Sequence, residues 1–533
     1  MKALILFSTA LAVAFCLTPC FADEELSNAN LDGLYARSIE QVLRLTPEQI
    51  DLGTAALIVS ESWSDVLPGR RYQEQLDDMA IEIRSRLKEE GIPLGAAAIR
   101  VINDYLYKDL KFKTIDKTDD PEDLFLHSVL DRRQGYCLSL SIVYLSIGER
   151  LGLPLYGVVV PGHFFVRFDD GKLRFNIEAT SKGGYITDEG YIKKFDAPKN
   201  NQNIYLLNLN KRQTLGCFFN NLGNVYHDIG NIDQAMAALE WAVYINPSLA
   251  ESRLNLGSIY LQKDRINDAI NELQHAIRIN PNEAKAHANL GKAYQKRKLY
   301  GDSIAELSAA IRLDPKLTDA YKMLAETYVE LDRLIDARTI LVRAIAISPR
   351  DAALYCGLGE VYSRSEQCEE AIIRYNKAIA LKPDFAEAYA GLGFCYGKLE
   401  QPEKEISAYV KALAIKPDIQ AALVNLGNAY FNKGQYDFAI KQFKKALSIT
   451  PGDTSLTNAI GTAYTNKGNY RTASEYYLKT IELDPKMAEA HYRLGYVYYK
   501  MQMYDSAHEQ VIKADRLGFE IDQNLLKAIE KRK

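Results

Sequence analysis

The fold is decided by a stretch of the chain that first occurs at residues 220–247, with the sequence NNLGNVYHDIGNIDQAMAALEWAVYINP. Leu222 and Tyr226 lie four residues apart and therefore share one face of a helix. Ala235 and Leu239 have the same spacing and share one face of a second helix. A proline then stops this helix, because proline lacks the N–H that would continue the helical hydrogen bonds. The stretch predicts two antiparallel helices.

The same stretch returns every 34 residues along the rest of the chain. Glycine, tyrosine and alanine positions keep this period, and eight of the 17 prolines mark the ends of successive units. A single pair of helices cannot bury its own apolar face, so the units are expected to stack against one another. The eight prolines are Pro247, Pro281, Pro315, Pro349, Pro383, Pro417, Pro451 and Pro485.

This repeat resembles the tetratricopeptide (TPR) family over nine units, which span residues 216–521. The resemblance implies an all-α superhelical solenoid, in which the first helices of the units line a concave groove that receives an extended peptide or a partner helix. Four positions depart from the pattern: Ala325 replaces the repeat glycine, Ser303 and Glu405 replace the small residue that opens the second helix, and Phe519 stands where a ninth proline would be. Residues 522–533 are expected to form a polar capping helix.

Asparagines recur in the predicted groove, either two residues before the repeat glycine or one residue after it. An amide both donates and accepts, so a row of amides can pair with a peptide backbone whatever its side chains are. This resembles the asparagine ladder of TPR proteins that grip peptides. The alternative is that these side chains bond to neighbouring helices or face water. The candidate peptide-binding residues are Asn221, Asn224, Asn255, Asn289, Asn425 and Asn428.

Composition excludes several classes of protein. The 533 residues are 47% hydrophobic and 25% charged, with a formal net charge of −4, so we expect neither a disordered chain nor a nucleic-acid binder driven by positive charge. No cluster of histidines or cysteines has the spacing of metal ligands, and no glycine-rich phosphate loop follows a strand. We therefore expect no cofactor and no metal.

The N-terminus has the pattern of a secretory signal peptide. Met1 and Lys2 give a positive start, residues 3–17 are apolar, and Cys20 and Ala22 place small residues where a signal peptidase reads. An uncleaved anchor is the alternative, although the run is shorter than the roughly 20 residues that span a bilayer. We expect residues 1–22 to be removed, leaving a bacterial protein without a membrane span, located in the periplasm.

The residues between this signal and the repeats do not repeat, and they predict an α+β domain. Helical patterns come first, one of them expected to begin at Thr46 and to continue into the apolar run of residues 50–59. Short strands follow at residues 158–160, 163–168 and 173–177. We assign residues 23–208 to this domain and 209–215 to a linker.

The chemistry of this domain centres on Cys137, which is expected in the first turn of a helix, where the helix dipole favours a thiolate. His163 lies on a predicted strand, and its ring can accept the thiol proton if the strand packs across the start of the helix. Asn176 and Glu178 alternate onto one face of the next strand, so either one can orient the imidazole.

This order of residues resembles the transglutaminase-like branch of the papain-like cysteine enzymes over roughly residues 120–190. The helical residues before this region resemble the N-terminal helices of a bacterial subgroup of that family. The resemblance implies that Cys137 is the nucleophile, His163 the general base and acid, and Glu178 the orienting carboxylate. The segments that carry it are Gly135-Tyr136-Cys137, Arg150-Leu151-Gly152-Leu153-Pro154, Gly162-His163 and Asn176-Ile177-Glu178-Ala179-Thr180.

Two features depart from this family. The third member is a glutamate in place of the usual aspartate, and Phe164 and Phe165 stand where a tryptophan is usual near the histidine. The backbone N–H of Cys137 is an expected donor to the oxyanion, with the side chain of Gln134 as a further candidate.

Two functions are compatible with the sequence. The first is an exported cysteine hydrolase or acyl transferase, most simply a peptidase or amidase, which acts on a polypeptide or peptidoglycan-like amide delivered by the TPR groove. Transglutamination, in which an amine replaces water, is a variant of it. The second is a non-catalytic periplasmic scaffold that assembles protein partners. Both predict a protein or extended peptide as partner, and no nucleic acid.

Overall fold

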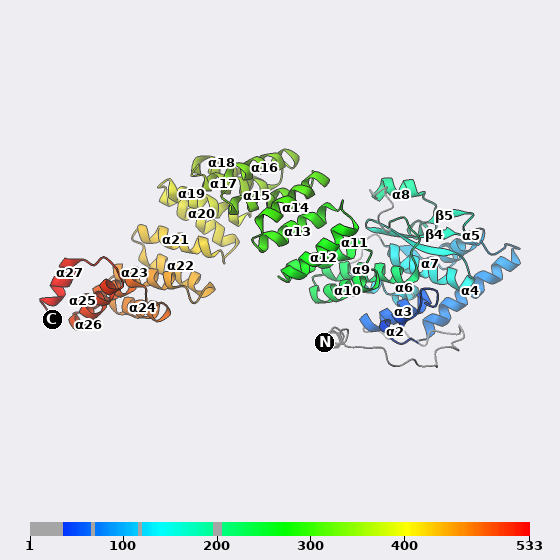
Figure 1. Cartoon of the computed structure of the whole chain (residues 1–533), viewed down its shortest axis with the longest axis horizontal. Helices are drawn as coiled ribbons and strands as arrows, with labels where there is room; N and C mark the ends of the chain where they lie inside the picture. Colours follow the sequence, from blue (N-terminus) through cyan, green and yellow to red (C-terminus); the bar gives the residue numbers. More distant parts are fainter. Residues whose placement is uncertain (1–35, 65–69, 116–119, 196–204) are drawn as a thin grey trace. The chain divides into compact units, whose positions relative to one another are not determined.

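The structure is a computed structural model that describes residues 36–64, 70–115, 120–195 and 205–533. The predicted signal at residues 1–22 lies outside the described residues. The chain divides into two compact units, Met1–Pro281 and Asn282–Lys533, and Figure 1 labels the helices and strands of both. None of the helices in the described ranges is long and apolar enough to cross a lipid bilayer.

Helices precede the sheet in the first unit, as expected. The predicted helix start at Thr46 is wrong, because residues 47–49 form a turn and Asp51 caps the helix instead, accepting a hydrogen bond from the N–H of Thr54 at 2.6 Å. The helices are α2 (Ile39–Arg44), α3 (Leu52–Trp63), α4 (Arg71–Glu89), α5 (Ala98–Asn103), η2 (Asp104–Asp109), η3 (Pro121–Asp123), α6 (Leu126–Arg132) and α7 (Cys137–Leu151).

Three antiparallel strands follow in the order β3 (Leu155–Val160), β4 (His163–Asp169) and β5 (Arg174–Ile177), close to the predicted positions. The β3–β4 turn pairs Val160 with His163 and needs the positive φ of +68° at Gly162. Helix α7 packs against β3 and β4 (Figure 1). The remaining elements are β1 (Lys113–Thr114), β2 (Gln134–Gly135), η4 (Ala179–Ser181) and α8 (Asp188–Phe195).

The first repeat helix, α9 (Lys211–Asp228), is built into the core of the first unit. The segment expected to be a linker, residues 209–215, is instead a β-bridge between Leu209 and Gly157 followed by the start of α9. Phe218 and Phe219 are completely buried, which stabilises the fold by about 2 to 3 kcal/mol for each ring. The domain and the first repeat therefore fold around a shared core.

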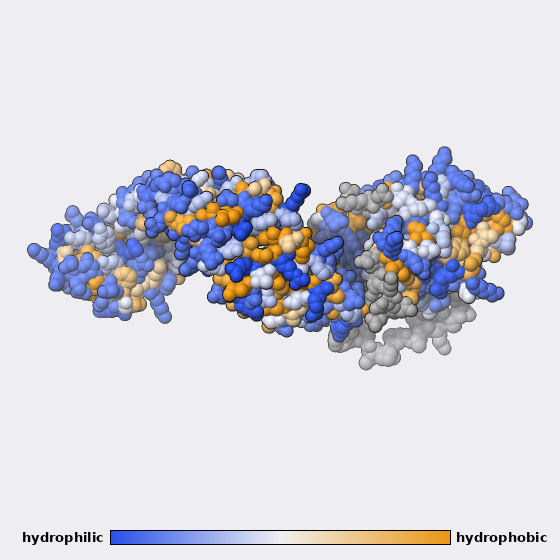
Figure 2. All heavy atoms as spheres, turned by 90° about the horizontal axis from the view of Figure 1, so that it is seen from above, coloured by the Kyte–Doolittle hydropathy of each residue, from blue (hydrophilic) through white to orange (hydrophobic). Residues whose placement is uncertain are grey.

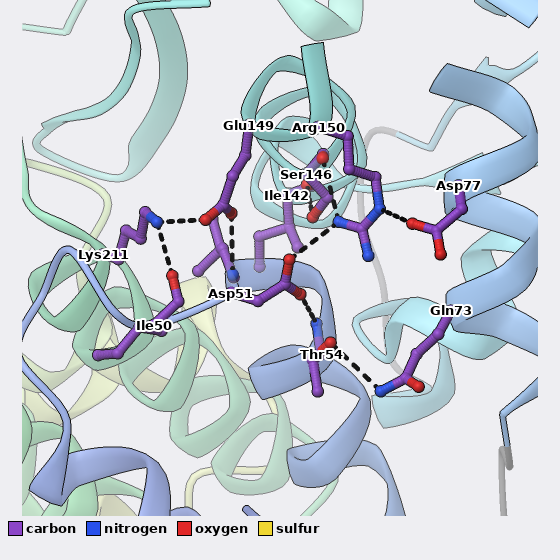
Figure 3. Close-up of polar contacts among 11 residues, drawn as sticks. Ile50, Asp51, Thr54, Gln73, Asp77, Ile142, Ser146, Glu149, Arg150 and Lys211 are labelled. Carbon is purple, nitrogen blue, oxygen red and sulfur yellow. Dashed lines mark hydrogen bonds and ion pairs between the residues drawn. The ribbon is translucent and has the colours of Figure 1, made fainter. Parts of the chain in front are cut away.

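Polar contacts at the end of α7 also hold α9 in place (Figure 3). The Glu149 carboxylate forms an ion pair with Lys211 of α9 and accepts a hydrogen bond from the N–H of Leu52 at 3.0 Å. Its neighbour Arg150 donates to Asp77 at 2.6 Å and to Asp51 at 3.2 Å. Helix α7, which begins at the candidate nucleophile, is thus tied at its other end to α3, α4 and the first repeat.

Replacing Glu149 with alanine is expected to lower the free energy of unfolding by about 1 to 3 kcal/mol, because it leaves the Leu52 N–H without its acceptor and the Lys211 ammonium with only the Ile50 carbonyl oxygen. Urea denaturation followed by circular dichroism measures the change. Glu189→Ala, on the exposed side of α8, is the control and should cost less than about 0.5 kcal/mol. Equal losses for the two variants would contradict this role.

The repeats form nine helix pairs within the described residues, in the predicted register. A Cβ atom at Gly427 would lie 2.4 Å from the ring of Phe443, so glycine is required where the two helices of that pair cross. The pairs are α9–α10 (Ile232–Ile245), α11 (Ala250–Gln262)–α12 (Ile266–Ile279), α13 (Ala284–Lys296)–α14 (Tyr300–Leu313), α15 (Thr318–Glu330)–α16 (Leu334–Ile347), α17 (Ala352–Arg364)–α18 (Cys368–Leu381), α19 (Ala386–Lys398)–α20 (Pro402–Ile415), α21 (Gln420–Asn432)–α22 (Tyr436–Ile449), α23 (Thr454–Asn466)–α24 (Tyr470–Leu483) and α25 (Ala488–Lys500)–α26 (Tyr504–Arg516).

The second unit ends in a short amphipathic helix, α27 (Gln523–Glu530). Leu525 and Ile529 of this helix are buried in a cluster with Val511 of α26, and Leu526 packs against it, while the polar residues Gln523, Lys527 and Glu530 are exposed, as expected of a capping helix. On the face shown in Figure 2, apolar residues (orange) form separate patches within a largely hydrophilic surface (blue).

Candidate active site

The thiol of Cys137 lies at the first residue of α7 and is 4% exposed. The backbone reaches this position through Arg133, which has a φ of +51°, and the two residues of β2. Gly135 is required there, since a Cβ atom would lie 2.7 Å from Ser139 Oγ. The same Ser139 hydroxyl accepts a hydrogen bond from the N–H of Tyr136 at 2.9 Å, which caps the start of the helix.

The structure brings the three predicted catalytic residues together. His163 Nε2 lies 2.7 Å from Glu178 Oε2, and the imidazole lines the same cavity as Cys137, whose proximity contributes to the raised pKa of His163. Because Nε2 faces the carboxylate, the other ring nitrogen is the one available to the sulfur. The order sulfur, imidazole, carboxylate is the geometry of a nucleophile, its base and the group that orients the base.

The charges of these groups are strongly coupled. Burial lowers the pKa of His163, but hydrogen bonds and charge interactions with Cys137 and Glu178 outweigh burial and raise it to about 9. Burial raises the pKa of Glu178, but its interactions with His163, Thr180 and Tyr191 outweigh burial and lower it to about 2. At neutral pH the ring is therefore a cation held by an ionised carboxylate, and a cation beside the sulfur stabilises a thiolate.

Glu178 is 1% exposed, and its two oxygens accept further hydrogen bonds that sequence reasoning missed. The Tyr191 hydroxyl donates to Oε2 at 2.7 Å, while the N–H and the hydroxyl of Thr180 donate to Oε1 at 3.1 and 2.6 Å. These donors fix the carboxylate, so the longer side chain of glutamate is accommodated without loss of the bond to His163.

The ring of His163 is held by an aromatic stack. Phe195 of α8 lies parallel to it, with ring centroids 4.6 Å apart and an interplanar angle of 5°. Tyr191, on the same helix, stacks on Phe165 at 3.8 Å. Phe165, one of the two phenylalanines that replace the expected tryptophan, belongs to this stack. Tyr191 and Phe195 are four residues apart, so their helical spacing is the signal that could have identified them.

The alternative orienting residue Asn176 and the candidate oxyanion donor Gln134 do not take part in the contacts around His163. Asn176 accepts a hydrogen bond from Arg167 Nε at 2.7 Å and donates to Asp188 Oδ1 at 2.7 Å. It therefore supports the start of α8 and does not contact His163. Gln134 is not among the residues that line the cavity described next.

Cys137 and His163 line a small cavity of about 20 Å³, which is room for roughly one water molecule. Side chains of the first two repeats form one wall of this cavity. No group of side chains suited to hold a metal ion occurs in the described parts of the chain. The other lining residues are Val159, Val160, Gly162 and Phe164 from the sheet, and Cys217, Asn220, Asn221, Leu249 and Glu251 from the repeats.

The six predicted peptide-binding asparagines are divided equally between the two units. Asn221 lines the cavity beside Cys137, whereas Asn255 donates hydrogen bonds to Asn224 at 2.9 Å and to Asn220 at 3.2 Å. In the second unit, Asn425 bonds to the hydroxyl of Tyr409. The other two, Asn289 and Asn428, also belong to the second unit, the former half-buried and the latter exposed. Peptide binding by this set stays a prediction.

Comparison with known families agrees with the predicted resemblance and fold class. A model of the transglutaminase-like superfamily matches residues 70–215. TPR repeat models match residues 223–264, 257–298, 284–317, 364–400, 386–419, 421–453 and 461–502. The chain therefore contains a transglutaminase-like domain followed by an all-helical TPR array, and this combination supports a scaffold that binds proteins.

Individual proteins match parts of the chain. A UPF0162 protein of Xylella fastidiosa (strain Temecula1) is 29% identical over 213 residues, which cover 38% of this chain and 73% of that protein. A UPF0162 protein of Xylella fastidiosa (strain 9a5c) is 36% identical over 126 residues, 23% of this chain and 43% of that protein. F-box only protein 21 of Mus musculus is 39% identical over 82 residues, 15% of this chain and 13% of that protein. The chain thus spans less than half the length of the latter two relatives.

Solved structures resemble part of the chain. The crystal structure of MamA is 29% identical and covers 30% of this chain and 95% of that one, with a TM-score of 0.28. YrrB, described as a TPR protein with an unusual peptide-binding site, is 22% identical and covers 35% of this chain and 97% of that one, with a TM-score of 0.29.

Proposed function

We propose that this chain is a cysteine acyl-transfer enzyme, most simply a peptidase or amidase, whose substrate is a polypeptide or peptidoglycan-like amide presented by the TPR groove. The observation that supports this proposal is that His163, held by Glu178 at 2.7 Å, lines the same cavity as Cys137, with the first repeats forming one wall. Residues 1–22 are proposed to export the enzyme to the periplasm. The mass of the exported chain tests this part, since it should begin at Asp23.

The proposed reaction uses the groups in the order in which they lie. The Cys137 thiolate attacks the amide carbonyl carbon and forms a tetrahedral oxyanion, and the C–N bond then breaks as the His163 cation gives its proton to the leaving amine. The product of this step is a thioester. Water attacks the thioester carbonyl while His163 accepts a proton from it, and the C–S bond breaks to release the carboxylic acid and the thiolate.

A non-catalytic scaffold is the second candidate, and the size of the site favours it. The cavity of about 20 Å³ does not admit a peptide segment, and Cys137 is 4% exposed. In this alternative the transglutaminase-like domain is an inactive binding module, and the array assembles protein partners. Catalysis requires the wall of the cavity to open, and the scaffold does not.

Iodoacetamide distinguishes the two functions at pH 6. Burial raises the pKa of Cys356 and of Cys395 to about 12, so both remain thiols, whereas the proposed nucleophile shares its cavity with the His163 cation. We expect Cys137 to be labelled at least about tenfold faster than these reference cysteines, as measured by peptide mass spectrometry. The selectivity should disappear in His163→Ala. Labelling of Cys137 no faster than the reference cysteines would favour the scaffold.

A further inference from the structure

Asn220 is a buried amide from the first repeat helix that lines the same cavity as Cys137 and His163. Its side chain is 4% exposed. Its Oδ1 accepts a hydrogen bond from Asn255 Nδ2 at 3.2 Å, and this is the only side-chain hydrogen bond of Asn220 within the described residues, so its own NH₂ group is not used there. A buried amide with its oxygen held by a neighbour and its donors left over is oriented for a ligand that accepts hydrogen bonds.

The proposed reaction creates such an acceptor in this cavity. When the thiolate adds to the carbonyl carbon, the carbonyl oxygen becomes an oxyanion, and enzymes of this kind stabilise it with preorganised N–H donors. The backbone N–H of Cys137, in the first turn of α7, is one expected donor. Among the described residues of the transglutaminase-like domain, no side-chain amide lines the cavity. Gln134, the amide predicted as a further donor, is not part of its wall.

We propose that the side-chain NH₂ of Asn220 is the second oxyanion donor, and therefore a catalytic residue supplied by the TPR array. Among the polar side chains from the repeats, Glu251 is an acid and Cys217 offers only a weak S–H donor, since burial keeps its pKa well above the usual value. Asn221 also lines the cavity but is half-buried and makes no bond that orients it. The inference rests on the proposed acyl transfer, and it makes the first repeat part of the catalytic centre.

Two reagents applied to the full chain separate this role from a structural one. p-Nitrophenyl acetate acylates Cys137 through a tetrahedral oxyanion and releases p-nitrophenolate, whereas iodoacetamide alkylates it by displacement at a CH₂ group, with no oxyanion. In Asn220→Ala we expect acylation of Cys137 to be about 100-fold slower, with alkylation within about twofold of the wild type. The burst of p-nitrophenolate and peptide mass spectrometry measure the two rates.

Matched variants complete the test. Asn271 is an exposed amide of the second repeat that does not line the cavity, so Asn271→Ala should leave both rates unchanged. Asn220→Asp keeps the shape but replaces the donor with an acceptor, and its acylation should be at least as slow as that of Asn220→Ala. Unchanged acylation in Asn220→Ala, or an equal loss in both reactions, overturns the proposal. If wild-type Cys137 reacts selectively with neither reagent, the proposed function itself fails.

Discussion

Replacing Glu178 with glutamine is expected to lower the free energy of unfolding at pH 6 by about 3 kcal/mol, one of the two largest effects predicted for this protein. The carboxylate is buried and accepts hydrogen bonds from His163, Tyr191 and Thr180. Glutamine has the same shape but only one acceptor oxygen, and its NH₂ group faces groups that are themselves donors. The substitution therefore breaks a fully satisfied network and removes the partner of the His163 cation.

The loss should depend on pH in a defined direction. The pKa of His163 is raised to about 9, so its pairing stabilises the fold fully below its ordinary pKa of about 6.5, and this part is lost as pH rises through about 9. The pKa of Glu178 is lowered to about 2, so its part is present above its ordinary value of about 4.5 and is lost as pH falls toward 2. The two pKa shifts arise from the same His163–Glu178 interaction, so their contributions to stability are not added together. The difference between wild type and Glu178→Gln should be largest between about pH 4.5 and 6.5.

Urea denaturation at a series of pH values measures this difference. The matched control is Glu189→Gln, which removes an exposed carboxylate from the neighbouring helix α8 and should change stability by less than about 0.5 kcal/mol at every pH. The same variant should bring the pKa of His163 down from about 9, and NMR titration of the ring follows it directly. A loss that is constant from pH 4 to pH 9 would show that the pairing of charges does not contribute.

Much of this molecule can be predicted because its signals are local or periodic. The 34-residue spacing of prolines such as Pro247 and Pro281 determines both the helices and their pairing, since each unit contacts mainly its neighbours. The strands around His163 follow from alternation and turn residues. Cys137, His163 and Glu178 could be proposed together because their order along the chain matches a family pattern.

Other parts could not be predicted because they depend on contacts between segments distant in sequence. Asn220 directly precedes the predicted peptide-binding residue Asn221. Only the packing of α9 against the domain places Asn220 in the wall of the cavity that contains Cys137. Residues 209–215 looked like a linker, since nothing in their composition signals that Leu209 bridges to Gly157. The capping of α3 by Asp51 depends likewise on side-chain geometry that a proline-based start signal does not contain.

The support for the site extends to Arg167, which is 1% exposed and lies on β4, the strand that carries His163. Its guanidinium contacts Asp188 at 2.5 Å, Asn176 at 2.7 Å and the carbonyl oxygen of Leu206 at 2.6 Å. Asp188 is the first residue of α8. Arg167 therefore fastens α8, the helix that carries both Tyr191 and Phe195, to the sheet. A buried cation is tolerated here because each of these partners accepts a hydrogen bond from it.

Arg167→Met is therefore expected to lower the free energy of unfolding by about 3 to 5 kcal/mol, because Asp188 loses its cationic partner and the Oδ1 of the buried Asn176 loses its donor. Arg174→Met is the control: its ion pair with Asp169 involves an arginine side chain that is 61% exposed, and its loss should cost less than about 1 kcal/mol. In conditions where Arg167→Met remains folded, α8 should be less firmly held, and labelling of Cys137 at pH 6 should slow because the stack on His163 loosens. Wild-type labelling together with the full loss of stability would show that α8 supports the fold without orienting the imidazole.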